Sequence, residues 1–190
     1  IRKRTRVTID IIRGREEADL IFSNFSIATL DRDRDYVYVD VGGGSTEITL
    51  IRQGERVEAK SFRIGSVRLL KDQVKPEVRE GLEAWCRELV AKHYVADPIV
   101  IGSGGNINRL FKLSGGVGKD PITREALEVT FRKLEMASHA ERLDRFGLKP
   151  DRADVIVPAC RIYLDAMNLF GAKTIIVPKV GLGDGMVLEL

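Results

Sequence analysis

The sequence predicts an α/β fold in which one mixed sheet is covered by helices. Segment 36–64 is rich in β-branched residues and contains the turn Gln53-Gly54-Glu55, as expected of a three-stranded antiparallel meander. After it, long amphipathic patterns alternate with two short apolar runs at 99–101 and 174–177. The meander and these two runs together predict a mixed five-stranded sheet flanked by helices.

Length and composition fit one domain over residues 1–190. The chain has 190 residues, of which 44% are hydrophobic, which is enough for one solid core. No apolar window approaches the roughly 18 residues of a membrane span, and no charged-then-apolar leader opens the chain. We therefore expect no membrane association and no signal peptide.

The formal net charge of +3 comes from the start of the chain, because without Arg2, Lys3, Arg4 and Arg6 the remainder carries −1. No basic patch is interleaved with aromatic residues. We therefore expect no nucleic-acid partner.

The elements before the meander are a strand and a helix start. Segment 7–12 alternates and is β-branched, which predicts a strand, and Gly14 precedes a short helix over 16–22. Local chemistry gives Glu16 and Glu17 the role of favouring the dipole of that helix. The charged segment 31–35 is of mixed sign and predicts a solvated turn.

The meander should consist of strands over 36–41, 48–51 and 57–64, closed by Gly65. From Pro76 to Tyr94, apolar residues recur every three or four positions, which predicts an amphipathic helix that ends before Asp97-Pro98. The wholly apolar run 99–101 predicts a buried parallel strand.

The last part of the chain should be mostly helical. Helices are expected over 107–113 and 124–138, the latter with Leu127, Phe131 and Leu134 inward, followed by a short piece up to Phe146. A further helix is expected over 154–170, with Pro158 near its first turn and Gly171 as its stop. A strand over 174–177 and a flexible turn at 181–185 complete the chain.

Two glycine-rich loops follow predicted strands. The first glycine loop, residues 42–46, consists of Gly42, Gly43, Gly44, Ser45 and Thr46. Bare backbone and hydroxyl groups can surround one phosphate, and the flanking carboxylates of Asp40 and Glu47 are ligands suited to Mg²⁺. The alternative is a glycine-rich β-hairpin with 47–51 as the returning strand, and the residues alone leave both interpretations open.

The second glycine loop, residues 102–106, contains Gly104, Gly105 and Asn106 and leads into the helix expected from Ile107. A strand, glycine turn and helix in this order direct free N–H groups and a positive helix end at whatever lies in the turn. Two such loops strengthen the prediction of a phosphate site.

The two cysteines, Cys86 and Cys160, both lie on apolar faces of predicted helices. Neither has metal-ligand spacing to the other or to His93 and His139. Buried reduced thiols are therefore expected, and a cytoplasmic location fits them.

The motifs taken in order resemble the exopolyphosphatase/guanosine pentaphosphate phosphohydrolase family. The resemblance covers nearly the whole chain and rests on the segments 16–18 (EEA), 39–47 (VDVGGGSTE), 61–69 (SFRIGSVRL), 101–105 (IGSGG), 152–159 (RADVIVPA) and 181–186 (GLGDGM).

This resemblance implies an actin-like, ribonuclease-H-like ATPase fold, in which two similar domains face each other across a cleft that binds phosphates and Mg²⁺. The chain would be the second domain, and nothing in it matches the first. The implied substrates are polyphosphate or guanosine pentaphosphate, and the missing N-terminal domain would be a partner. A homodimer is left open.

The resemblance also implies site roles. Glu17 would be the general base, Asp40 and Glu47 would bind the cation, the first glycine loop would hold the scissile phosphate, and Gly104, Gly105 and Asn106 would hold further phosphates. Asn106 stands where the family often has Thr. Arg63 and Arg68 would either help bind polyphosphate or be solvated residues of a strand and a helix start.

Three functions remain open from the sequence. The first is a Mg²⁺-dependent phosphohydrolase whose isolated second domain releases little or no phosphate. The second is the nucleotide-binding domain of an actin-like kinase. The third is a folded module without catalytic activity.

Overall fold

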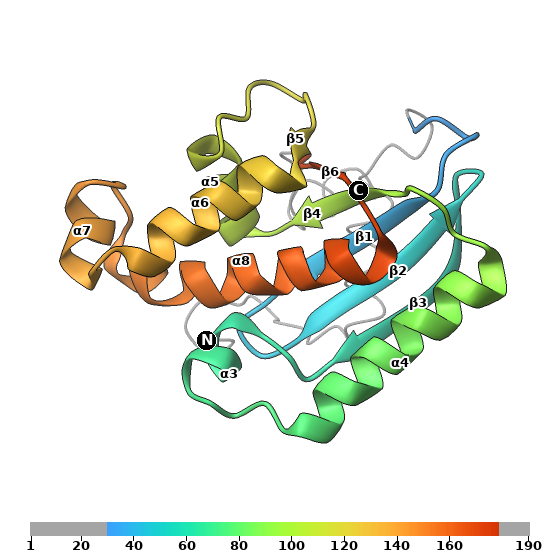
Figure 1. The fold of residues 1–190 in the computed structure, drawn as a ribbon, viewed down its shortest axis with the longest axis horizontal. Coiled ribbons are helices and arrows are strands. Elements are labelled where there is room, and N and C mark those ends of the chain that lie inside the picture. The colour runs from blue at the N-terminus through green and yellow to red at the C-terminus, as the bar shows by residue number, and fades with distance from the viewer. Residues whose placement is uncertain (1–29, 179–190) are drawn as a thin grey trace, which may run out of the picture.

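The computed structural model describes residues 30–178, which form one six-stranded mixed sheet and the helices that pack on it (Figure 1). The strand order is β3-β2-β1-β4-β6-β5. The α/β class expected from the sequence is confirmed.

The predicted meander is formed by β1 (Tyr36–Val41), β2 (Thr46–Arg52) and β3 (Glu55–Phe62), each antiparallel to the next. On the other side of β1 lies β4 (Ile99–Ser103), which runs parallel to it, as its continuous apolar sequence predicts. β6 (Thr174–Ile176) is parallel to β4. As a result, β1 occupies the middle of the sheet between an antiparallel and a parallel neighbour.

The helices follow the predicted patterns. α4 (Pro76–His93) begins with a proline, whose missing N–H would have no partner in the first turn, and α6 (Arg124–Met136) is capped by the Thr123 side chain. The others are α3 (Ser66–Leu70), α5 (Gly105–Leu113), α7 (His139–Asp144) and α8 (Pro150–Phe170).

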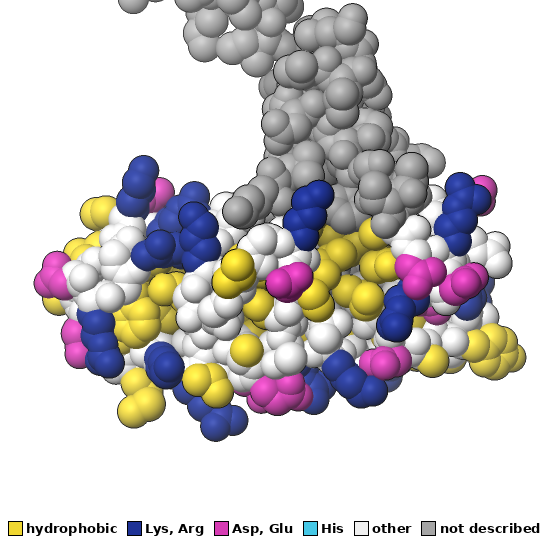
Figure 2. Space-filling view, turned by 90° about the horizontal axis from the view of Figure 1, so that it is seen from above, with side chains coloured by type: hydrophobic (Ala, Val, Ile, Leu, Met, Phe, Trp, Pro, Cys, Tyr) yellow, Lys and Arg dark blue, Asp and Glu magenta, His cyan; other side chains and the backbone are white. Residues whose placement is uncertain are grey.

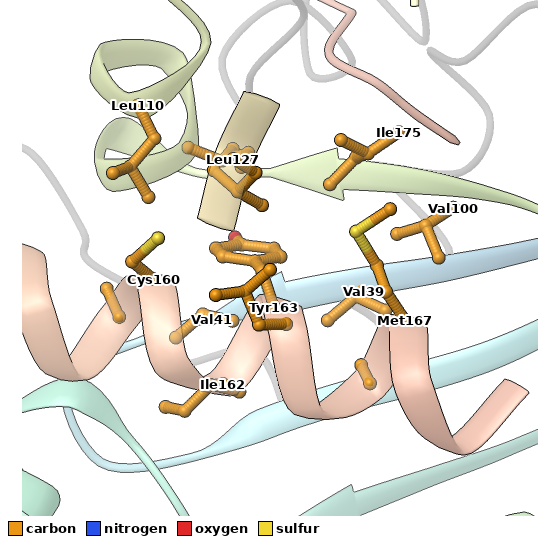
Figure 3. Packing of buried hydrophobic residues seen from close by; sticks show 14 of the residues in the cluster. Val39, Val41, Val100, Leu110, Leu127, Cys160, Ile162, Tyr163, Met167 and Ile175 are labelled. Carbon is orange, nitrogen blue, oxygen red and sulfur yellow. The ribbon is translucent and has the colours of Figure 1, made fainter. Parts of the chain in front are cut away.

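The long helix α8 is the centre of the larger core. It lies across the front of the sheet in Figure 1 and contacts α3, α4, α5, α6 and α7 as well as β1. Figure 3 shows Tyr163 and Met167 projecting from α8 among apolar side chains of the sheet, including Val39 and Val41 of β1. A smaller apolar cluster on the opposite face joins Tyr36, Tyr38, Ile51 and Ile101.

Three elements differ from the sequence expectation. The sheet has six strands, not five, because β5 (Ile122–Thr123) pairs with β6, and a two-residue strand carries no periodicity to read. The helix α5 begins at Gly105, two residues before the predicted start. The short helix α3 was expected only as a possible helix start around Arg68.

The predicted position of Pro158 within its helix was also wrong. α8 begins at Pro150 rather than Asp154, so Pro158 lies inside the helix and not near its first turn. A proline inside a helix removes one backbone hydrogen bond and strains the turn before it. Buried side chains on both sides of Pro158, among them Ala153, Ile156, Cys160 and Tyr163, hold the helix against the core across this defect.

Several predictions lie outside the described residues. They are the strand over 7–12, the helix start over 16–22 with Glu16 and Glu17, and the turn over 181–185. Of the helices between residues 30 and 178, none combines the length and the apolar character needed to cross a membrane.

The prediction of buried reduced thiols is confirmed for both cysteines. Cys86 on α4 and Cys160 on α8 are free and fully buried. Burial raises the pKa of each thiol to about 12, because the thiolate would lose its hydration.

We therefore predict that neither thiol reacts with a chromogenic disulfide reagent at pH 8 while the protein is folded. A pKa of about 12 leaves about one thiol in ten thousand ionised at that pH. Addition of denaturing urea should release both thiols to the reagent. Rapid labelling of a thiol in the native protein would contradict the burial described above.

Candidate functional site

The site predicted from the sequence lies where β1 and β4 end. In the sheet register Asp40 of β1 is directly opposite Glu47 of β2 and directly opposite Ser103 of β4. Because residues opposite one another across a sheet share a face, these three side chains emerge side by side. β1 and β4 are parallel, so the loops that follow them leave the same edge of the sheet.

The two glycine loops are in contact through Asp40. A Cβ atom built on Gly104 would lie 3.3 Å from Oδ1 of Asp40 and 3.7 Å from the carbonyl oxygen of Val41. The structure therefore brings the second glycine loop against Asp40, which flanks the first glycine loop and lies about 60 residues earlier in the sequence.

The first glycine loop is the turn of a β-hairpin. The N–H of Gly42 donates to the carbonyl of Ser45 at 2.9 Å, and β2 returns antiparallel to β1 from Thr46. The hairpin alternative is thus confirmed for the backbone. It does not exclude a phosphate site, which stays a prediction, because the same turn exposes Gly42, Gly43 and Gly44.

The carbonyl groups of this loop are held by the segment that follows β3. The hydrogen bonds run from Ser66 N to Gly42 O at 3.0 Å, from Val67 N to Gly43 O at 3.0 Å, and from Arg68 Nε to Gly44 O at 2.9 Å. By contrast, the N–H groups of Gly43, Gly44 and Ser45 donate to no other described residue. The start of α3 thus occupies the acceptors of the loop and leaves consecutive donors available for an anion.

Close packing at Gly65 makes this arrangement possible. Gly65 has an extended backbone, with φ −137°, so its conformation does not require glycine. However, a Cβ atom on Gly65 would lie 2.4 Å from the carbonyl carbon and oxygen of Gly43 and 2.5 Å from the nitrogen of Gly44. Only a residue without a side chain lets the two backbones approach this closely.

The hydroxyl groups of the first glycine loop are engaged differently. Ser45 Oγ donates to Oε1 of Glu47 at 2.9 Å, and Ser61 Oγ donates to the same oxygen at 2.7 Å. Thr46 is fully buried, and its hydroxyl donates to the carbonyl of Ile64 at 2.6 Å. The Thr46 side chain therefore supports the loop from inside, and of the two predicted hydroxyl donors only Ser45 stays at the rim.

The second glycine loop connects a strand to a helix, as expected from the sequence. Gly104 has φ +105°, a conformation that favours glycine, and α5 starts at Gly105 without a side-chain cap. The N–H groups of Gly105, Asn106 and Ile107 find no acceptor among residues 30–178. The free donors and the positive end of the α5 dipole thus coincide at this loop.

Two arginines contact the glycine loops. Arg68 donates to Gly44 as described, and Arg152 at the start of α8 donates through Nη1 to the carbonyl of Gly105. Arg63 is exposed. From the sequence, Arg152 stands out only as part of the motif over 152–159, because its approach to Gly105 depends on how α8 packs.

The donor set at the strand ends fits a hard divalent cation. Mg²⁺ is commonly held by one or two carboxylates together with phosphate oxygens and water, and Asp40 and Glu47 are paired directly across β1 and β2. Within the part of the chain that the structure describes, no group of three or more His, Cys, Asp or Glu residues could hold a metal ion. Any further ligands would have to come from substrate, water or residues outside that part.

Charges of both signs are mixed on the molecular surface. Figure 2 shows Lys and Arg side chains interspersed with Asp and Glu side chains on one face, with apolar side chains between them. Together with the near-neutral charge of the sequence after residue 6, this mixture suits recognition at local sites more than attraction to one extended polyanionic surface.

We predict that Gly65→Ala lowers the free energy of unfolding by about 1–3 kcal/mol, because the new methyl group overpacks against Gly43. Gly81→Ala is the matched control, since Gly81 lies in α4 with no atom within 4 Å of its added Cβ, and it should stabilise by about 0.5–1 kcal/mol. Urea unfolding of both variants measures the difference. Equal effects of the two substitutions would show that the contact of Gly65 with the loop is unimportant.

Comparisons with known proteins identify the family of this chain. The model of the Ppx/GppA phosphatase family matches residues 1–190. A guanosine-5'-triphosphate,3'-diphosphate pyrophosphatase of Vibrio cholerae is 27% identical over 197 residues, covering 96% of this chain. The chain spans only 39% of the length of that relative.

Solved structures show the same fold. The Aquifex aeolicus Ppx/GppA enzyme aligns with a TM-score of 0.77 at 22% identity, covering 100% of this chain and 68% of that one. An exopolyphosphatase from Cytophaga hutchinsonii aligns with a TM-score of 0.75 at 24% identity, covering 98% and 66%. The fold is thus the actin-like fold expected from the sequence. The chain belongs to the Ppx/GppA phosphatase family.

Proposed function

We propose that this chain is the second domain of a Mg²⁺-dependent phosphohydrolase that removes the terminal phosphate from polyphosphate, from guanosine pentaphosphate or from both. The observation that carries the proposal is the meeting of two loops, whose N–H groups have no acceptor among the described residues, beside a pair of carboxylates. The names of the relatives support this reaction class.

In the proposed reaction, the N–H groups of Gly43, Gly44 and Ser45 hold the terminal phosphoryl oxygens, and those of the second glycine loop hold phosphates further along. Oriented donors of this kind stabilise the charge on phosphoryl oxygens as the bond to the leaving group breaks. When bound, Mg²⁺ would neutralise part of the same charge. Asp40 and Glu47 would hold it, with Ser45 and Ser61 orienting Glu47.

The base that activates water is proposed to be Glu17. A carboxylate that acts as general base would orient an in-line water and take its proton. Glu17 lies outside the described residues, so its role rests on the EEA motif and on family membership.

The other half of the binding cleft is proposed to come from a preceding domain. We expect the 190-residue chain alone to release little or no phosphate, since phosphates would be held from one side only. We also propose a cytoplasmic location, because both thiols are free and a reducing compartment keeps thiols free.

We predict that the complete protein releases phosphate from at least one of the two substrates, supplied in parallel with Mg²⁺. Glu17→Ala should lower that rate by about 10²–10⁴-fold while leaving polyphosphate binding nearly unchanged, because a general base acts on water and not on affinity. Glu16→Ala is the matched control and should retain the rate.

Two outcomes would contradict this assignment. Normal turnover by Glu17→Ala would remove Glu17 from the role of base. Transfer of phosphate from ATP to an added acceptor, without release from either substrate, would favour a kinase of the same fold.

We also predict that Asp40→Asn raises the Mg²⁺ concentration for half-maximal activity by about tenfold or more, because one anionic ligand becomes neutral. Asp33→Asn, an exposed change near the opposite end of β1, should leave the titration unchanged. A metal titration of phosphate release compares the two. Identical curves would exclude Asp40 as a ligand.

A further inference from the structure

One buried hydroxyl is bonded to the end of the strand that precedes the second glycine loop. Tyr163 projects from α8 into the core, where its side chain is fully buried (Figure 3). Its hydroxyl donates to the carbonyl oxygen of Ser103, the last residue of β4. The backbone of Val41, the last residue of β1, lowers the pKa of the same hydroxyl.

This contact lies where strand pairing stops. The parallel register of β1 and β4 ends with Asp40 opposite Ser103, and beyond these residues the chains separate into the two glycine loops. No further backbone pairing between β1 and β4 follows among the described residues. The Tyr163 hydroxyl thus anchors the carbonyl of Ser103, the residue directly opposite Asp40 where the ladder ends.

The environment of this hydroxyl keeps it protonated. Burial raises the pKa of Tyr163 well above its ordinary range, and the negative charge of Asp40 raises it further, while the Val41 backbone acts in the opposite direction. The hydroxyl therefore stays protonated and keeps its donor role at physiological pH.

We propose that Tyr163 is a positioning residue that holds Asp40 and the second glycine loop in register for phosphate hydrolysis. The proposal rests on the function proposed above. Tyr163 lies in the interior behind the site, so it acts through the backbone of Ser103, which precedes Gly104 and is opposite Asp40, and not by touching substrate.

The close contacts of the site explain why a small shift would matter. Oδ1 of Asp40 lies within 3.3 Å of the Cβ position of Gly104, and Gly104 holds a backbone conformation that other residues rarely adopt. A separation of the strand ends would move the carboxylate and the free N–H groups of α5 relative to each other. A displacement of about 1 Å in such a constellation can lower a rate by about a hundredfold.

Tyr163→Phe in the complete protein tests the proposal, because it removes the hydroxyl and keeps the ring. Tyr36→Phe is the matched control. Tyr36 is also a buried tyrosine, its hydroxyl accepts one hydrogen bond from the N–H of Asp31 at 3.3 Å, and it lies at the opposite end of β1.

Amide hydrogen exchange followed by mass spectrometry gives a readout that does not depend on activity. In Tyr163→Phe, exchange over residues 42–45 and 104–107 should be faster by about tenfold, while exchange in β2 is unchanged. In Tyr36→Phe both loops should exchange at the wild-type rate. A uniform acceleration that includes β2 would show a merely structural role and would overturn the proposal.

Kinetics give the second readout. With polyphosphate as substrate, Tyr163→Phe should lower kcat by about tenfold to a hundredfold and change KM by less than about threefold, because alignment is lost and binding is retained. A wild-type kcat in Tyr163→Phe would overturn the proposal. Failure of the wild-type protein to release phosphate would instead refute the proposed function. The exchange experiment does not measure phosphate release, so its result is independent of that failure.

Discussion

The parallel pairing of β1 with β4 is the constraint on which the candidate site depends. Each strand is followed by a glycine loop, and parallel strands have their carboxyl ends at the same edge of a sheet. Two segments about 60 residues apart in sequence are therefore brought to one place. The antiparallel return of β2 adds Glu47 opposite Asp40 at the same edge.

A second constraint determines which backbone groups of the first loop are available. A turn of glycines can present either carbonyl groups or N–H groups to a ligand, and only the latter bind anions. Here α3 and Arg68 occupy the carbonyl groups, and the close approach of Gly65 permits that contact. The anion binding that we propose for the loop thus depends on a segment about 20 residues further along the chain.

Most of the fold could be read from local patterns. The long helices bury one face over several turns, and that burial leaves a periodic signal in the sequence. The strands of the meander and β4 appear instead as short β-branched or wholly apolar runs between turns. The misjudged features lack such a signal. β5 has two residues, and Pro158 is tolerated inside α8 only because tertiary contacts hold the helix on both sides of it.

By itself the sequence determined the fold class and the two glycine loops with their flanking carboxylates. It also determined the resemblance to a family, and the family match over residues 1–190 confirms that resemblance. These features are encoded in residue type and order, which do not depend on partners distant in the chain. Tertiary structure decided that Thr46 faces the interior while Ser45 stays at the rim, that Gly65 supports the first loop, and that Tyr163 is bonded to the end of β4. Each of these depends on contacts between segments distant in sequence, for which a local pattern carries no signal.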